Sequence, residues 1–337
     1  MIWHGGQNPL QFSGVLLAFV LTACGGGGGG GATPGLPPAS HGPIANVVDN
    51  WIMYGHDSRH TSASRANVNG RFQVMWRYDP QAASGDTFSA LYNAVAMTTG
   101  VYVHWFQSGA SILSAGPSVD GISVNGARTW TFVAKKDYDL GHWLSVFNSD
   151  VVFQDDEEGF LSSATGKLVS QGAKSWPYTF DMWGETIPDP SGLYGAIETS
   201  NLVARAQSDL HTVWSVSAVP ASPSAPVLAN GLVIIGTGNG IEAHDSATGR
   251  LVWTSPVQPA GYGMLTGMCA ALASNTLVVT ANDGLHVLSL ANGGALWHGT
   301  VAGAQGTVMN PVIVNDPARG ATVYVTDNRG VIALAAH

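Results

Sequence analysis

Four consecutive carboxylates at residues 155–158 form the densest group of potential ligands in the sequence, directly before Gly159. Carboxylate oxygens suit Ca²⁺, which takes about six to eight oxygen ligands. Side chains of consecutive residues in a turn point in different directions, however, and the alternating ligand spacing of an EF-hand is absent. We therefore predict a solvated hairpin tip over Asp155 to Glu158 rather than a calcium site.

Histidines offer a second kind of ligand. His56 and His60 flank Asp57, but two imidazoles do not complete a metal site, and the sequence does not ensure a helix that would bring them together. A loop is predicted there. Five further histidines share no spacing and are interpreted as individual residues, so no metal site is predicted: His142, His211, His244, His286 and His298.

Two features, a glycine run and a possible Ser-His-Asp triad, could indicate anion binding or catalysis, but both have simpler interpretations. The run Gly236–Gly240 is similar to a phosphate-binding loop, but no helix follows whose N-terminus would face an anion, so a turn between strands is predicted. A Ser-His-Asp triad is not excluded by composition, yet the sequence contains no Gly-x-Ser-x-Gly elbow. No catalytic residue is predicted.

An aromatic segment, "SWPYTFDMWGE", lies between repeat units, where loops that connect blades are expected. Loops on a rigid scaffold tend to carry binding residues, and Trp and Tyr are frequent hot-spot residues. The alternative is that these rings pack between blades. The candidate binding residues are Trp176, Tyr178, Asp181, Trp183 and Glu185.

An apolar stretch of about a dozen residues, 12–23, precedes Cys24. It is too short to span a bilayer, which takes about 20 residues, and it suits the core of a signal peptide. The ending Leu21-Thr22-Ala23-Cys24 resembles a bacterial lipobox, which predicts a signal peptide over residues 1–23 and a lipidated Cys24. The leader has no Lys or Arg, a departure from the usual basic start.

A flexible tether is predicted over residues 24–48, because an unbroken glycine run and a Pro-rich stretch cannot bury apolar surface. Gly25 follows the cysteine in place of the Asp that retains enteric lipoproteins at the inner membrane, so the resemblance indicates the outer membrane of the cell envelope. Cys269, the other cysteine, is predicted to be a buried free thiol.

Composition excludes one class of partner. The 337 residues carry 13 Lys and Arg against 22 Asp and Glu, a formal charge of −9. Nucleic-acid binding needs a basic patch, and none is visible in the sequence.

The body of the sequence repeats at intervals of about 40 residues. Gly240, Gly284 and Gly330 hold the same place in the last three units. Each unit has an apolar strand, a polar glycine turn, a second strand, and then a turn leading to a strand with tryptophan. Earlier units are more divergent, and the six marker positions are Trp76, Trp130, Ser170, Trp214, Trp253 and Trp297.

Short strands joined by glycine turns make small twisted sheets, which bury both faces only when neighbours stack on them. We predict an all-β fold: a single β-propeller of four-stranded blades over residues 49–337, with tryptophans wedged between blades. Six markers indicate six blades. Seven is the alternative, if the stretch between Trp76 and Trp130, or that between Ser170 and Trp214, contains another sheet. The strand around Trp76 is predicted to complete the C-terminal blade.

The repeats resemble the quinoprotein-like (PQQ-like) propellers over roughly residues 50–337. The family signature is Ala-Asp-x-x-Thr-Gly-Lys-x-x-Trp, and its best copy here runs from Ala243 to Trp253 with one extra residue before the Asp. Residues 163–167 form a partial second copy, and the opening at 51–64 resembles the segment that starts the propeller in this family.

The resemblance implies one of two activities. One branch contains dehydrogenases that bind pyrroloquinoline quinone (PQQ) and Ca²⁺, and the other contains scaffolds such as the outer-membrane assembly lipoprotein that supports barrel insertion. This sequence lacks the adjacent cysteines of many quinone-binding alcohol dehydrogenases and a recognisable Glu, Asn and Asp set for Ca²⁺, and it is shorter than the eight-bladed enzymes. We expect a monomeric, non-enzymatic envelope lipoprotein without cofactors that binds a protein or polymer. The alternatives are a PQQ- or metal-dependent oxidoreductase, and a hydrolase or lyase on the same scaffold.

Overall fold

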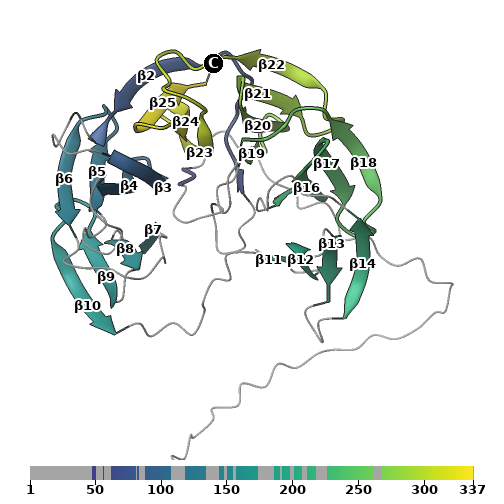
Figure 1. Ribbon diagram of the computed structural model, residues 1–337, viewed down its shortest axis with the longest axis horizontal. Coiled ribbons are helices and arrows are strands. Elements are labelled where there is room, and N and C mark those ends of the chain that lie inside the picture. Colours follow the sequence, from purple (N-terminus) through teal and green to yellow (C-terminus); the bar gives the residue numbers. More distant parts are fainter. Residues whose placement is uncertain are drawn as a thin grey trace, which may run out of the picture. The chain divides into compact units, whose positions relative to one another are not determined.

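The computed structural model describes residues 48–50, 56, 62–80, 82, 88–107, 118–133, 144–147, 150–154, 157–173, 186–189, 192–197, 201–206, 211–217, 226–260 and 267–336. Their twenty-five regular elements are all strands, gathered into six sheets (Figure 1). The described residues contain no helix of the length and apolarity needed to cross a membrane.

Three sheets come from the first part of the chain. Their strands are β3 (Phe88–Met97), β4 (Gly100–Gln107), β5 (Ser118–Ser123) and β6 (Arg128–Val133); β7 (Leu144–Phe147), β8 (Asp150–Gln154), β9 (Glu157–Ser162) and β10 (Leu168–Ala173); β11 (Thr186–Asp189), β12 (Gly192–Ile197), β13 (Asn201–Arg205) and β14 (Thr212–Ser217).

The other three sheets involve the second part of the chain. Their strands are β15 (Val227–Ala229), β16 (Leu232–Thr237), β17 (Gly240–Asp245) and β18 (Leu251–Ser255); β19 (Met268–Ala271), β20 (Thr276–Ala281), β21 (Gly284–Ser289) and β22 (Ala295–Gly299), extended by β1 (Ala63–Ser64); β23 (Met309–Asp316), β24 (Gly320–Thr326) and β25 (Val331–Ala335), extended by β2 (Gln73–Tyr78).

Each sheet is an antiparallel meander in which successive strands pair, and the two exceptions both come from the N-terminal side. The short β1 pairs in parallel with β19, whereas β2 pairs in antiparallel register with β25 and becomes the fourth strand of the C-terminal sheet (Figure 1). The described residues of each stretch in which an extra blade was considered, 76–130 and 170–214, contribute strands to one new four-stranded sheet, β3–β6 or β11–β14, whose last strand ends just beyond the stretch. The number of blades in the ring and its closure stay predictions.

The repeat glycines lie where the second hairpin of a sheet meets the outer strand. Gly240 and Gly284 have φ values of +127° and +132°, which side chains rarely adopt. A Cβ at either position would also collide with a carbonyl oxygen of the outer strand, that of Ser255 or Gly299. A Cβ at Gly330 would meet the carbonyl of Tyr78 in the same way, so β2 occupies in its sheet the place that β18 and β22 occupy in theirs.

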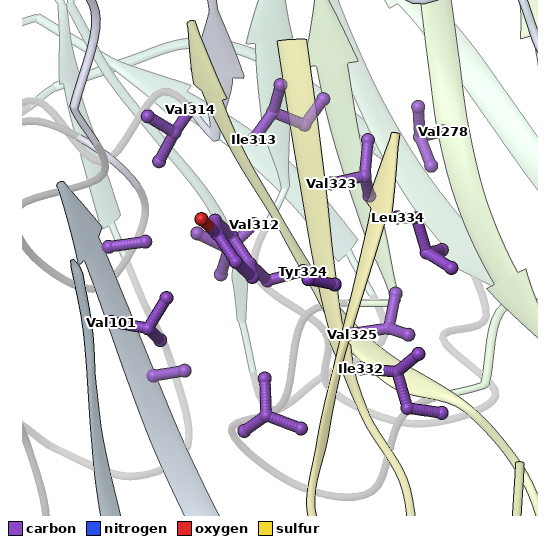
Figure 2. Packing of buried hydrophobic residues seen from close by; sticks show 14 of the residues in the cluster. Val101, Val278, Val312, Ile313, Val314, Val323, Tyr324, Val325, Ile332 and Leu334 are labelled. Atoms are coloured by element: carbon purple, nitrogen blue, oxygen red, sulfur yellow. The ribbon is translucent and has the colours of Figure 1, made fainter. Parts of the chain in front are cut away.

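Neighbouring sheets contact each other most closely at their first strands: β3 lies against β7 and β23, and β19 against β15 and β23. Figure 2 shows what this stacking buries. Val312, Val314 and Tyr324 of the C-terminal sheet point toward Val101 of β4, whereas Ile313 and Val323 point toward Val278 of β20. A sheet that is apolar on both faces must be covered on both faces, which is the physical reason for the stack.

Tryptophans link the outer strands to the next sheet. Each indole lies over a turn glycine of positive φ, whose missing Cβ makes room for the ring, and its Nε1–H donates to a carbonyl of that turn. The four pairs are Trp76 over Gly126 with Val124 O at 2.7 Å, Trp130 over Gly166 with Ser163 O at 2.8 Å, Trp214 over Gly249 with Ser246 O at 3.0 Å, and Trp253 over Gly293 with Leu290 O at 2.8 Å.

The fifth tryptophan, Trp297, meets a turn glycine supplied from the other end of the chain. Its ring lies over Gly70, which has a φ of +101° and stands just before β2, and packs edge-on against Phe72 at 5.1 Å between centroids. The N-terminal segment therefore provides both the fourth strand of the C-terminal sheet and the surface on which Trp297 packs.

A buried ion pair fixes β2 in the C-terminal sheet. The guanidinium of Arg77 donates to both oxygens of Asp327, at 2.6 and 2.9 Å, across 250 residues of sequence. Burial acts to raise the pKa of Asp327, but Arg77 and backbone N–H donors, including that of Gln305 at 2.6 Å, outweigh it and hold that pKa below the usual value. The pair joins the two ends of the described chain.

Candidate functional site

The sequence-predicted binding residues and the predicted anchor lie outside the described residues. These are Trp176, Tyr178, Asp181, Trp183, Glu185 and Cys24. Their roles stay predictions.

The predicted hairpin tip at residues 155–158 is only partly right. Glu158 pairs with Gln154 of β8 and Glu157 with Ala173 of β10, so both residues belong to β9, whereas residues 155–156 lie outside the described part. The run Gly236–Gly240 spans the turn between β16 and β17, as predicted, with Gly238 and Asn239 as the turn residues.

His56 takes part in a polar cluster near the start of the described chain. Its Nε2 donates to Asp49 Oδ1 at 3.0 Å, while the other carboxylate oxygen accepts from Ser64 Oγ at 2.9 Å. In a catalytic triad the histidine stands between serine and carboxylate. Here the carboxylate stands between them, so the cluster fastens the segment before β1 and does not activate the serine.

A second carboxylate, Asp120, is fully buried between the sheets of β2 and β5. It accepts hydrogen bonds from Tyr78 Oη and Thr131 Oγ1, both at 2.6 Å. Burial raises the pKa of Asp120 and of Tyr78, and the charge of Asp120 adds to the rise at Tyr78. Both oxygens are occupied by these donors, so the group bridges two sheets. Cys269 is likewise buried, with its thiol pKa raised by burial.

The interpretation of the histidines as individual residues is wrong for His286 and His298. They are directly opposite each other on β21 and β22, and their rings stack 4.2 Å apart between centroids with 21° between planes. Asp283, in the turn before β21, accepts from His286 Nε2 at 2.8 Å and lies 3.4 Å from His298 Nε2. The hydrogen bond from His286 lowers the pKa of Asp283.

These three residues test the cofactor that the PQQ-like resemblance implies. Among the residues that the structure describes, Asp283, His286 and His298 are the one group whose ligand atoms could hold a metal ion together. Ca²⁺, the partner of the quinone, takes oxygen ligands, and two imidazoles do not suit it. This group therefore does not suit Ca²⁺, and the expectation that no cofactor binds stays a prediction.

The outer strands expose apolar side chains at one repeated position. In five of the six described sheets the residue directly before the marker position is apolar and between 41% and 58% exposed: Met75, Val169, Val213, Val252 and Leu296. We call these five residues the outer-strand row. In β6 the position belongs to Thr129, whose Oγ1 donates to the carbonyl of Gly121. Single exposed apolar side chains are common on protein surfaces, so the row is distinguished only by its recurrence at one structural position.

Stacked four-stranded meanders joined by tryptophans define the class of this protein: it is a PQQ-like β-propeller. The chain belongs to the family described as outer membrane protein assembly factor BamB, whose model matches residues 116–337.

Three solved structures were compared with the chain. BamB from Moraxella catarrhalis shares 18% sequence identity, with 72% of this chain and 68% of that chain covered and a TM-score of 0.37. Quinohemoprotein alcohol dehydrogenase from Comamonas testosteroni shares 14%, covering 82% and 57% with a TM-score of 0.33. The Pan2 WD40 domain from Neurospora crassa shares 11%, covering 79% and 95% with a TM-score of 0.38. A search of curated proteins gave no match.

Proposed function

We propose that this protein is an outer-membrane-anchored lipoprotein whose propeller binds protein partners as a non-enzymatic scaffold in the cell envelope. The observation that carries the proposal is the match of the BamB family model to residues 116–337, a family described by its part in outer membrane protein assembly. In this proposal Cys24 carries the lipid, and residues 24–48 hold the propeller away from the membrane.

The stacked sheets support a binding role because they hold exposed groups rigidly. Trp253, 7% exposed, fixes β18 against the next sheet, while Val252 beside it is 41% exposed. Met75, Val213 and Leu296 likewise precede a tryptophan that packs on a turn glycine, whereas Val169 precedes Ser170. A partner that covers the row gains roughly 25 cal/mol for each Å² of apolar surface removed from water and loses little conformational entropy at a rigid surface.

Each outer strand is also the last strand of its sheet, and such an edge presents a row of backbone donors and acceptors. A partner segment in extended conformation pairs with such an edge, and its side chains contact the exposed row. The aromatic segment with Trp176, Tyr178 and Trp183 is proposed as a second contact region, with Asp181 and Glu185 as its polar groups.

Crosslinking from native membranes tests the proposal. We expect the full-length chain to capture a discrete envelope protein, and Val252→Asp to reduce capture at least severalfold. Thr254→Asp is the matched control, because Thr254 is exposed on the same strand and the change adds the same charge without removing apolar surface. Equal capture by both variants would exclude the outer-strand row, and failure of the wild-type chain to capture any discrete partner would remove support for a scaffold.

Two further measurements separate this proposal from its alternatives. Cys24→Ser is expected to release the protein from the membrane fraction, and unchanged fractionation would contradict lipid anchoring. The chain mixed with PQQ and Ca²⁺ is expected to show no cofactor absorbance and no dye reduction with alcohols or sugars. Cofactor-dependent dye reduction would instead assign an oxidoreductase.

A further inference from the structure

We propose that Asp283, His286 and His298 form a binding site for one divalent transition-metal cation, with Zn²⁺ as the reference ion. The site is independent of the scaffold role and lies on the sheet formed by β19–β22. Its three ligand atoms, one from each side chain, all lie within 4.8 Å of one another.

The hairpin brings the three groups together. Asp283 occupies the turn that joins β20 to β21, because Ala281 pairs with Gly284 across it. His286 follows two residues after Gly284, and His298 faces it across the β21–β22 ladder. Both imidazoles present Nε2 to the same carboxylate, at 2.8 and 3.4 Å from its two oxygens.

The 3.4 Å between His298 Nε2 and Asp283 already matches a tetrahedral ion, and the 2.8 Å between His286 Nε2 and Asp283 must widen when the cation enters. Zinc binds imidazole nitrogen and carboxylate oxygen at about 2.0–2.2 Å, which places neighbouring ligand atoms of a tetrahedron about 3.3–3.5 Å apart. The cation takes the place of the proton that His286 Nε2 donates to Asp283, and that proton moves to Nδ1, so that the imidazole stays neutral. The His298 side chain is 47% exposed, and turning its ring about the soft χ2 torsion, away from the stacked arrangement, points its nitrogen at the ion.

Imidazole and carboxylate ligands together select the ion. Two nitrogens and one oxygen suit Zn²⁺, Ni²⁺ or Cu²⁺ rather than Ca²⁺ or Mg²⁺. Three protein ligands leave a coordination position for water or an external group. The formal charge of −9 on the chain favours cations.

The neighbouring sheets show that the fold does not require these side chains. In the sheet of β15–β18 the same three places are occupied by Asn239, Glu242 and Thr254, with Glu242 and Thr254 paired as His286 and His298 are. In the C-terminal sheet, Ile332 and Arg77 occupy the paired places. The hairpin therefore forms without histidine, and the two imidazoles with one carboxylate are particular to the β19–β22 sheet among these three.

Titration of the full-length chain, produced without a histidine tag, tests the site. We expect one Zn²⁺ per chain by isothermal titration calorimetry and a Tm that rises with added Zn²⁺. His298→Thr and Asp283→Asn introduce residues that the β15–β18 sheet holds at the same places, so the hairpin is expected to fold. Each should weaken Zn²⁺ binding at least about tenfold.

His211→Ala is the matched control, because it removes a described histidine that lies directly before β14, outside the β19–β22 sheet, and binding should be unchanged. Absence of stoichiometric Zn²⁺ binding by the wild-type chain would overturn the proposal. Binding that is equally tight in His298→Thr and Asp283→Asn, with far-UV circular dichroism showing all variants folded, would place the metal elsewhere and overturn it too.

Discussion

Replacing Trp253 with alanine should lower the free energy of unfolding more than replacing Val252, the exposed residue beside it, because Trp253 packs between two neighbouring sheets. The indole is 7% exposed, lies over Gly293 of the next sheet and donates to the carbonyl of Leu290 at 2.8 Å. Trp253→Ala removes the ring from a junction that cannot collapse fully, which typically costs about 3–5 kcal/mol. At roughly 2–4 °C per kcal/mol for a domain of this size, Tm should fall by about 6–20 °C.

Trp253→Phe separates the hydrogen bond from the packing. Phenylalanine keeps an aromatic ring over Gly293 but leaves the Leu290 carbonyl without its indole donor, and an unsatisfied buried acceptor costs about 1–3 kcal/mol. Its destabilisation should therefore fall between that of Trp253→Ala and zero.

Urea unfolding followed by far-UV circular dichroism measures both changes, since that signal does not depend on the removed indole. Val252→Ala is the matched control: the side chain is 41% exposed, and the cost should stay near 0.5 kcal/mol or less, as is usual for surface positions. A Trp253→Ala protein within about 1 kcal/mol of wild type, or equal to Val252→Ala, would refute the role of the tryptophans in holding the sheets together.

Two further predictions concern the turn glycines and the ends of the chain. Gly249→Ala should lower the free energy of unfolding by about 3 kcal/mol or more, because φ is +72° and the new Cβ would lie 2.8 Å from the Trp214 ring. Gly303→Ala is the control, with a φ of +75° but no atom within 4 Å of the new Cβ, and it should cost only the roughly 1–2 kcal/mol of a left-handed backbone. Equal costs in urea unfolding would show that the ring contact is unimportant. Arg77→Ala should cost about 3–5 kcal/mol of stability, because it leaves the fully buried side chain of Asp327 without its partner. Arg319→Ala breaks the ion pair with Asp316, in which the Arg319 side chain is 45% exposed, and should cost less than about 1 kcal/mol. Because the folded pKa of Asp327 lies below its ordinary 3.8, the stability it contributes is present above about pH 4 and lost as the pH falls through the folded pKa. Unfolding measured across that window should show a steeper acid loss in wild type than in Arg77→Ala, and parallel curves would contradict the assignment.

The repeat in the sequence predicted the positions that stacking constrains most. Gly240, Gly284 and Gly330 could be recognised because a carbonyl of the outer strand leaves no room for any side chain there. The divergent unit at Ser170 could still be aligned, and β10 keeps a register shift between Leu168 and Ser170 like the shift beside Trp214. Backbone geometry thus persists where the aromatic side chain has been replaced.

The grouping of His286 and His298 was missed, although the repeat carried a signal for it. His286 lies two residues after a marker glycine and His298 one residue after a marker tryptophan. Strands that start at a common turn have a fixed register, so these two offsets bring the residues opposite each other. Linear spacing alone, without strand pairing, made the histidines look unrelated.

The sequence by itself determined which residues build the repeat, because φ, side-chain volume and strand alternation act over a few neighbouring residues and leave a periodic pattern. Only the tertiary structure decided which distant groups meet: Arg77 with Asp327, Gly70 with Trp297, and Asp283 with the two stacked histidines. Those contacts depend on how strands pair and sheets stack, and this is a property of the whole folded chain that no local pattern carries.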